Sequence, residues 1–79
     1  MSEDVLPWIQ QWITHRRPGE LVQLEEDTDL YKAELLDSLG IIELIESLEE
    51  HYGFLFTEEE MLAGLTRVAD FQRIVTSKR

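Results

Sequence analysis

The residues best suited to chemistry are Ser38, which stands between Asp37 and Leu39, and two histidines, His15 and His51. A serine nucleophile needs a base within hydrogen-bond reach. His51 belongs to the same predicted helix as Ser38 but lies about 20 Å further along it at 1.5 Å per residue, so it cannot be the base. The sequence around Ser38 also lacks the Gly-x-Ser-x-Gly elbow of serine hydrolases. We therefore predict no catalytic residues and do not expect the chain to be an enzyme.

A metal site is not predicted either. The sequence contains no cysteine, which excludes a thiolate zinc site and a disulfide framework. His51 lies among Glu46, Glu49 and Glu50, and a lone histidine in an acidic helix is most simply polar surface. The acidic run at Asp27 lacks the glycine and the terminal glutamate of a calcium-binding EF-hand loop. Any thiol chemistry would need a thiol from outside the chain.

The length of 79 residues predicts one small domain over residues 1–79. A domain of this size buries only about 60% of the surface of its unfolded chain and has little room for an enclosed catalytic cleft, which favours a binding or carrying role. The first residues lack the basic and apolar regions of a secretory signal, and no apolar run reaches membrane-spanning length. We expect a cytoplasmic monomer with no membrane span.

The negative charge is concentrated in the middle of the chain. The net charge is -10, and residues 20–60 hold fourteen of the seventeen acidic residues but only one of the seven lysines and arginines, Lys32. Nucleic-acid binding requires a basic footprint, and anionic membranes repel such a charge, so neither is an expected partner. A basic protein surface is the natural partner, although acidic helices can also serve only to keep a domain soluble.

The first segment has the periodicity of an amphipathic helix that ends near residue 16. Pro7 is tolerated only in the first turn, which makes Ser2 or Asp4 the expected cap, and Pro18-Gly19 ends the run. The residues predicted to share one buried face are Val5, Trp8, Ile9, Trp12 and Ile13. For the two tryptophans, this spacing predicts a place in the core rather than a ligand site.

Residues 19–37 are too hydrophobic for a disordered linker and predict an ordered loop pinned to the core, with a short turn of helix around residues 30–34. A second helix begins at Asp37 or Ser38 and stops at Gly53. The apolar residues expected to pin the loop are Leu21, Val22, Leu24, Leu30, Tyr31, Leu35 and Leu36. The expected core face of the second helix comprises Ile41, Leu44, Ile45, Leu48 and Tyr52.

The remainder predicts two more helices. Residues 54–56 are expected to plug the core from a loop, and Thr57 with Glu60 matches a capping box that opens a short helix ending at Gly64. Thr66 is the expected cap of a last helix, whose core residues are Val68, Phe71, Ile74 and Val75. The predicted fold class is all-α: a small four-helix bundle with three main helices, one short helix and a long first loop.

Leu39 and Ile42 lie off the core face of the second helix, on the flank that carries Ser38 and Glu46. Two apolar side chains rimmed by carboxylates would suit a docking site. The alternative is that the long loop covers them.

These features together resemble the carrier-protein family, whose members hold acyl, aminoacyl or peptidyl groups on 4'-phosphopantetheine. The resemblance covers residues 28–75. Its motifs are Thr28-Asp29-Leu30, Asp37-Ser38-Leu39, "ELIESLEEHYGF" from Glu43, the acidic turn Thr57–Glu60 and "TRVADFQRIV" in the last helix. The tripeptide alone is weak, whereas the ordered set in a chain of this size and charge is specific.

The resemblance implies that Ser38 is the phosphopantetheine attachment site and that Asp37 and Leu39 flank the cofactor. A separate phosphopantetheinyl transferase would supply the catalysis. An adenylating ligase or an acyltransferase would load the cargo as a thioester, and downstream transferases or synthases with basic docking surfaces would receive it. The expected partner-binding residues are Ile42, Glu43, Glu46, Glu49 and Glu50.

Three departures separate the chain from fatty-acid carriers: Gly40 stands where those usually have an acidic residue, Glu46 replaces an exposed apolar residue, and Glu34-Leu35-Leu36 replaces a more glycine-bearing approach. The chain is more similar to free-standing carriers, such as the D-alanyl carrier of cell-wall modification and discrete natural-product carriers. The prediction is therefore a discrete acyl or aminoacyl carrier. The alternatives are a fatty-acid carrier and an unmodified acidic helical adaptor that binds a basic protein surface, in which Ser38 is only a helix cap.

Overall fold

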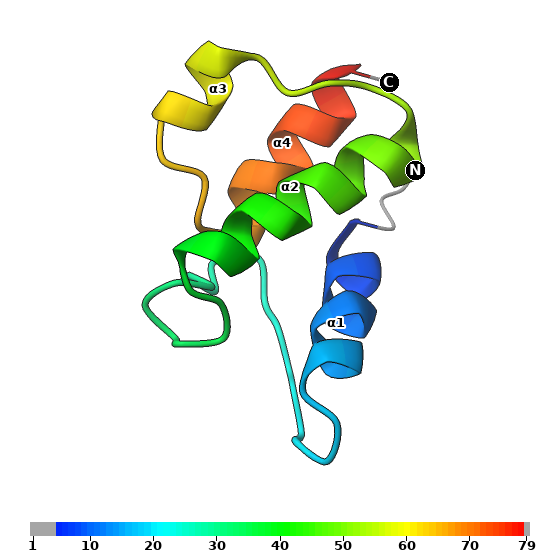
Figure 1. The fold of residues 1–79 in the computed structure, drawn as a ribbon, viewed down its shortest axis with the longest axis vertical. Helices are drawn as coiled ribbons and strands as arrows, with labels where there is room; N and C mark the ends of the chain where they lie inside the picture. Colours follow the sequence, from blue (N-terminus) through cyan, green and yellow to red (C-terminus); the bar gives the residue numbers. More distant parts are fainter. Residues whose placement is uncertain (1–4, 79) are drawn as a thin grey trace.

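Four helices joined by loops make up the fold in a computed structural model, which describes residues 5–78 (Figure 1). The helices are α1 (Val5–Arg16), α2 (Ser38–Tyr52), α3 (Glu58–Leu62) and α4 (Val68–Lys78). Within the described residues the only β pairing is a single bridge between Asp29 and Arg67, so no sheet is formed there. The all-α fold with three main helices, one short helix and a long first loop is confirmed.

Helix α1 places one row of side chains in the core. Val5, Ile9 and Ile13 are spaced by four residues and are buried, while Trp8 and Trp12 are only half-buried beside them. Pro7 is the third helical residue, where its missing N–H costs no hydrogen bond. The predicted caps Ser2 and Asp4 lie outside the described residues.

The core is built by α1, α2, α4 and the loops, and α3 contributes no buried residue. On α2 the predicted face is buried at Leu44, Ile45 and Leu48, with Ile41 and Tyr52 half-buried at its edges. All four predicted core residues of α4 are buried. The buried hydrophobic residues are Val5, Ile9, Ile13, Val22, Leu24, Leu30, Leu36, Leu44, Ile45, Leu48, Phe56, Leu65, Val68, Phe71, Ile74 and Val75.

The long first loop is pinned to this core, as predicted, by Val22, Leu24, Leu30 and Leu36. The prediction was wrong for Leu21, which is exposed, and for Tyr31, which is half exposed. Apolar content shows that a loop must pack but does not show which of its side chains point inward, because a loop has no fixed side-chain period. Residues 30–34 form turns, and no helix is present there.

The first loop also caps α4. The backbone carbonyls of Thr28 and Glu26 accept hydrogen bonds from the N–H groups of Val68 and Ala69, at 3.1 and 2.8 Å. The Thr66 hydroxyl donates to Asp29 instead, at 3.1 Å, so the prediction that Thr66 caps this helix was wrong. Backbone carbonyls 40 and 43 residues earlier in the sequence thus accept hydrogen bonds from the first turn of α4, the role that was expected of the Thr66 side chain.

The connection from α2 to α3 begins at Gly53 and continues through residues 54–56. Gly53 has a φ of 76° and ends α2 by donating its N–H to Glu49 O, as predicted. Phe56 is buried, but Leu55 is 74% exposed, so the prediction that all of residues 54–56 plug the core was wrong for Leu55. An extended backbone sends successive side chains in opposite directions, which exposes Leu55 between Phe54 and Phe56.

The predicted capping box of α3 is present. Thr57 Oγ1 accepts from Glu60 N, and Glu60 Oε1 accepts from Thr57 N. The hydrogen bond from the backbone N–H of Thr57 is the main reason that the pKa of Glu60 lies below its ordinary value, and Lys78 lowers this pKa further. The ion pair between Lys78 and Glu60 therefore links the end of α4 to α3, which has no buried side chains.

Candidate functional site

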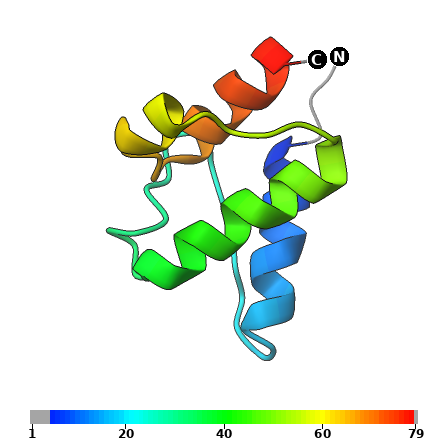
Figure 2. The ribbon, with the colours of Figure 1, turned by 45° about the horizontal axis from the view of Figure 1, so that its top comes forward.

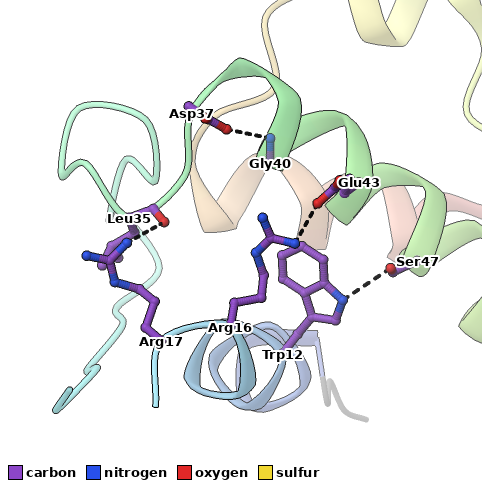
Figure 3. A network of polar contacts seen from close by, with 8 residues as sticks. All are labelled: Trp12, Arg16, Arg17, Leu35, Asp37, Gly40, Glu43 and Ser47. Carbon is purple, nitrogen blue, oxygen red and sulfur yellow. Dashed lines mark hydrogen bonds and ion pairs between the residues drawn. The ribbon is translucent and has the colours of Figure 1, made fainter. Parts of the chain in front are cut away.

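The start of α2 is capped by Asp37. Its backbone is extended, with φ −91° and ψ −173°, and its Oδ1 accepts a hydrogen bond from Gly40 N at 2.7 Å (Figure 3). Ser38 is the first helical residue and is exposed. No described residue forms a hydrogen bond with its hydroxyl. The cap that the adaptor hypothesis assigned to Ser38 is thus supplied by its neighbour, and the Ser38 hydroxyl is free.

The backbone around Ser38 is suited to an anion. Among the described residues, none accepts a hydrogen bond from the N–H of Ser38 or Leu39, and both groups lie at the positive end of a 15-residue helix. Gly40 packs tightly behind them: a Cβ at this position would lie 3.1 Å from Leu36 Cδ2 and 3.2 Å from Asp37 Oδ1. A phosphodiester on Ser38 could therefore meet unpaired donors without displacing an existing contact.

Leu39 and Ile42 are 63% and 52% exposed beside Ser38. The first loop therefore does not cover them, which removes the alternative left open by the sequence. Leu39, Ile42, Glu46 and Glu50 form one row along α2, which we call the exposed row, because residues three or four apart share a helix face. Their role in partner binding stays a prediction.

The four glutamates predicted to bind partners differ in their surroundings. Glu43 forms an ion pair with Arg16, and Glu49 Oε2 accepts a hydrogen bond from Phe56 N at 2.8 Å. Glu46 and Glu50 are exposed, and neither forms an ion pair with a described residue. Two of the four carboxylates thus have structural partners within the fold, and two are available to a second molecule.

Three contacts join α1 to α2 in a row, which we call the α1–α2 seam. Arg16 pairs with Glu43, Trp12 Nε1 donates to Ser47 Oγ at 3.1 Å, and the Trp8 ring stacks on His51 with centroids 5.0 Å apart. Figure 3 shows the first two contacts side by side.

The contacts of the seam are spaced by four residues on each helix and run in opposite chain directions. This arrangement was not predicted from the sequence, although its signal was visible there: Trp8, Trp12 and Arg16 are spaced by four residues, and so are Glu43, Ser47 and His51. The tryptophans are half-buried here rather than fully in the core.

His51 is held far from Ser38 by the seam, at the opposite end of α2. Within residues 5–78 no group of three or more histidine, aspartate or glutamate side chains is arranged to hold a metal ion. The geometry around Ser38 is an exposed hydroxyl beside unpaired backbone donors and an apolar flank.

The family of this protein follows from comparison with known sequences. The model of the family described as "Phosphopantetheine attachment site" matches residues 14–73, from the end of α1 into α4. The chain belongs to this family. Comparison with curated proteins gave no match.

Membership defines the class of the protein. Domains of this family are carriers that bear covalent 4'-phosphopantetheine and meet modifying and partner enzymes, and they are substrates rather than catalysts. The cofactor supplies a flexible arm whose terminal thiol holds cargo as a thioester, which the cysteine-free chain cannot provide itself. In the part of the chain that the structure describes, no helix is long and apolar enough to cross a membrane.

Proposed function

We propose that Ser38 is the attachment residue and that the protein is a discrete acyl or aminoacyl carrier. The observation that carries the proposal is the free, exposed hydroxyl of Ser38 at the start of α2, next to two unpaired backbone N–H groups. Asp37 holds the helix start in place, and Leu39 presents an apolar surface beside the arm. A single domain of this kind acts as a cytoplasmic monomer.

The chain itself contributes position and recognition. Ser38 receives the phosphopantetheine from a transferase, an adenylating ligase or an acyltransferase loads the thiol, and a downstream transferase or synthase removes the cargo. Tethering keeps the thioester at a high local concentration near each partner's active site. The alternative within the same family is a fatty-acid carrier, and the two are separated by which enzyme loads the arm.

Partners would dock on the exposed row of α2. Leu39 and Ile42 offer apolar contact next to Ser38, and Glu46 and Glu50 offer charges that steer a basic surface. Glu43 and Glu49 lie on the edges of this row and already have partners within the fold. A small, charged contact suits a carrier that must leave each enzyme quickly.

The deciding experiment is intact mass spectrometry after incubation with coenzyme A and a phosphopantetheinyl transferase of broad specificity. The parent should gain one phosphopantetheine, and Ser38→Ala should gain none while remaining folded. Ser47→Ala is the matched control, because Ser47 lies on the same helix and is bonded to Trp12. It should be modified like the parent.

Modification of Ser38→Ala, or failure of several transferases to modify the folded parent, would refute the assignment of Ser38. In the second case the acidic adaptor would be the hypothesis to pursue. If the parent is modified, mass shifts after incubation with an adenylating ligase or a malonyl transferase would separate an aminoacyl carrier from a fatty-acid carrier.

A further inference from the structure

A hollow of about 460 Å³ opens beside the residues that lead into α2. It is lined by Tyr31, Lys32, Glu34, Leu36 and Asp37, so its wall ends at the residue immediately before Ser38. The size lies within the range of roughly 300–1,000 Å³ that small-molecule sites occupy. Figure 2 shows this segment as the loop that projects next to the first turn of α2.

The wall of the hollow is held by hydrogen bonds within the chain. Asp29 Oδ1 accepts hydrogen bonds from the backbone N–H groups of Tyr31 and Lys32, at 3.1 and 2.9 Å. The Thr66 hydroxyl donates to the other carboxylate oxygen of Asp29. The hydrogen bond from the backbone N–H of Lys32 is the main reason that the pKa of Asp29 lies below its ordinary value. The turn that presents Tyr31 and Lys32 is therefore anchored to the segment before α4.

The other side of the turn is held by hydrogen bonds to the backbone carbonyls of Leu30 and Leu35. The carbonyl of Leu30 accepts hydrogen bonds from Leu35 N and Leu36 N, both at 3.1 Å, and Arg17 Nη1 donates to Leu35 O (Figure 3). Glu34 has a φ of 61°, a left-handed conformation that costs a non-glycine residue energy and persists only where its surroundings hold it. A hollow preformed in this way binds a ligand without first ordering a loop.

The lining carries one cation, Lys32, and two carboxylates, Glu34 and Asp37, of which Asp37 already accepts the hydrogen bond from Gly40 N. Lys32 is the only lysine or arginine in residues 20–60. Tyr31 is 52% exposed and offers a ring face, and the edge of Leu36 adds an apolar surface. Glu34 forms no hydrogen bond or ion pair through its carboxylate with any described residue, so it can accept hydrogen bonds from a ligand.

The phosphopantetheine of the family joins an anionic phosphodiester to a neutral chain with hydroxyl and amide N–H donors, and Lys32, Glu34 and the Tyr31 ring offer partners for these groups. The comparable hollow at the other end of α2 is lined by Glu46, Glu49 and Glu50 and by no cation, which disfavours an anion. The hollow beside Asp37 is thus the one that complements an arm attached at Ser38.

We propose that this hollow is a resting site for the proximal half of the phosphopantetheine arm. Lys32 and the free N–H groups of Ser38 and Leu39 bind the phosphodiester, while Tyr31, Glu34 and Leu36 contact the hydroxy-amide section. The proposal rests on the proposed function, because it requires attachment at Ser38. It places the hydroxy-amide section of the arm on the first loop, whereas partners would use the side chains of the neighbouring row on α2, and the two surfaces meet at Leu39.

The test compares apo and phosphopantetheinylated protein by two-dimensional ¹H–¹⁵N NMR, with intact mass confirming complete modification. Modification should shift the amide signals of residues 31–36 as well as those next to Ser38, and nuclear Overhauser contacts should join the arm's methyl groups to the Tyr31 ring. Lys32→Gln should be fully modified yet lose most of the shifts at residues 31–36. Arg73→Gln, which also removes one exposed cation, should retain them.

Shifts confined to residues 37–40, with arm signals as sharp as those of free phosphopantetheine, would overturn the resting site and leave the proposed function intact. Equal shifts in Lys32→Gln and the parent would refute the role of Lys32. A chain that gains no mass would instead overturn the proposed function and the resting site with it.

Discussion

Asp37 and Ser38 are neighbours with different tasks at the start of α2. The Asp37 carboxylate accepts the hydrogen bond from Gly40 N that a helix terminus requires, and Ser38 is left exposed with a free hydroxyl. A residue that must be modified by another enzyme cannot also be an essential cap, because an ester on its oxygen would alter that bond. If Ser38 is the attachment residue, as we propose, its modification leaves the cap of α2 intact.

This division predicts different stabilities for two alanine variants. Asp37→Ala should lower the free energy of unfolding by about 1 kcal/mol, the usual value of a helix cap, whereas Ser38→Ala should change it little. Urea denaturation of the unmodified proteins measures both. Asp37→Asn is the matched control, because an amide oxygen can also cap the helix. An equal loss in Ser38→Ala would show that the serine hydroxyl contributes to the cap after all.

The sequence identified the residues around Ser38 as a candidate site, but it did not show which side chains pair with one another within the fold. The sequence placed Leu39 and Ile42 off the core face of α2 beside Ser38, but it left open whether the first loop covers them, and only the structure shows that they are exposed. The pairing of Glu43 with Arg16 could not, because it depends on how two helices cross. Four glutamates that look equivalent in sequence acquire different roles only in the folded chain.

At the scale of elements, the α1–α2 seam determines how α2 is held. Its contacts connect α1 to the side of α2 that faces neither the core nor the exposed row. Arg16 also lies over the Trp12 ring, with Cζ 4.8 Å from the ring centroid, which couples two steps of the row. The seam thereby fixes the direction in which Leu39, Ile42, Glu46 and Glu50 point.

The hydrogen bond at the centre of the seam should be measurable by a double-mutant cycle. Trp12→Phe removes the donor and Ser47→Ala removes the acceptor, and we expect a coupling of about 1 kcal/mol in the free energy of unfolding. Thermal or urea denaturation of the four proteins gives this value. The pair Trp12→Phe and Ser38→Ala is the control and should be additive. Additivity of the Trp12 and Ser47 changes would show that the bond contributes nothing to stability.

Helix ends could be predicted where a local side chain or glycine forms them, as at Asp37, Gly53 and the capping box of Thr57 and Glu60. The start of α4 could not, because carbonyls of the first loop cap it. Sequence patterns report interactions within a few residues. The prediction failed at Thr66 because a distant segment caps α4, and it failed at Leu55 because the irregular backbone of a loop decides which side chains are buried.

At the scale of the whole molecule, the charge is unevenly distributed. The net charge is -10, and six of the seven lysines and arginines lie at positions 16–17 and 67–79, while fourteen of the seventeen acidic residues lie in residues 20–60. A field of this kind speeds encounter with basic surfaces but does not specify where they dock. The docking position should be set by Glu46 and Glu50, which follow Leu39 and Ile42 along the exposed row and have no ion pair among the described residues.

Two variants with the same net charge separate location from overall field. Glu46→Gln with Glu50→Gln and Glu25→Gln with Glu26→Gln each remove two negative charges, but Glu25 and Glu26 lie in the first loop, and the Glu26 carbonyl contacts α4. At low salt the first pair should lower kcat/KM for phosphopantetheinylation about fivefold, since two exposed ion pairs are worth roughly 0.5 kcal/mol each. The second pair should lower it much less.

Salt provides the internal check on this docking prediction. Near 1 M salt the screening length falls to about 3 Å, so the difference between the two double variants should disappear as electrostatic steering is lost. Equal rate losses in both variants at low salt would mean that net charge alone attracts the transferase. A loss at Glu46 and Glu50 that persists at high salt would indicate direct contact with these residues rather than steering, and would assign the exposed row of α2 a part of the bound interface itself.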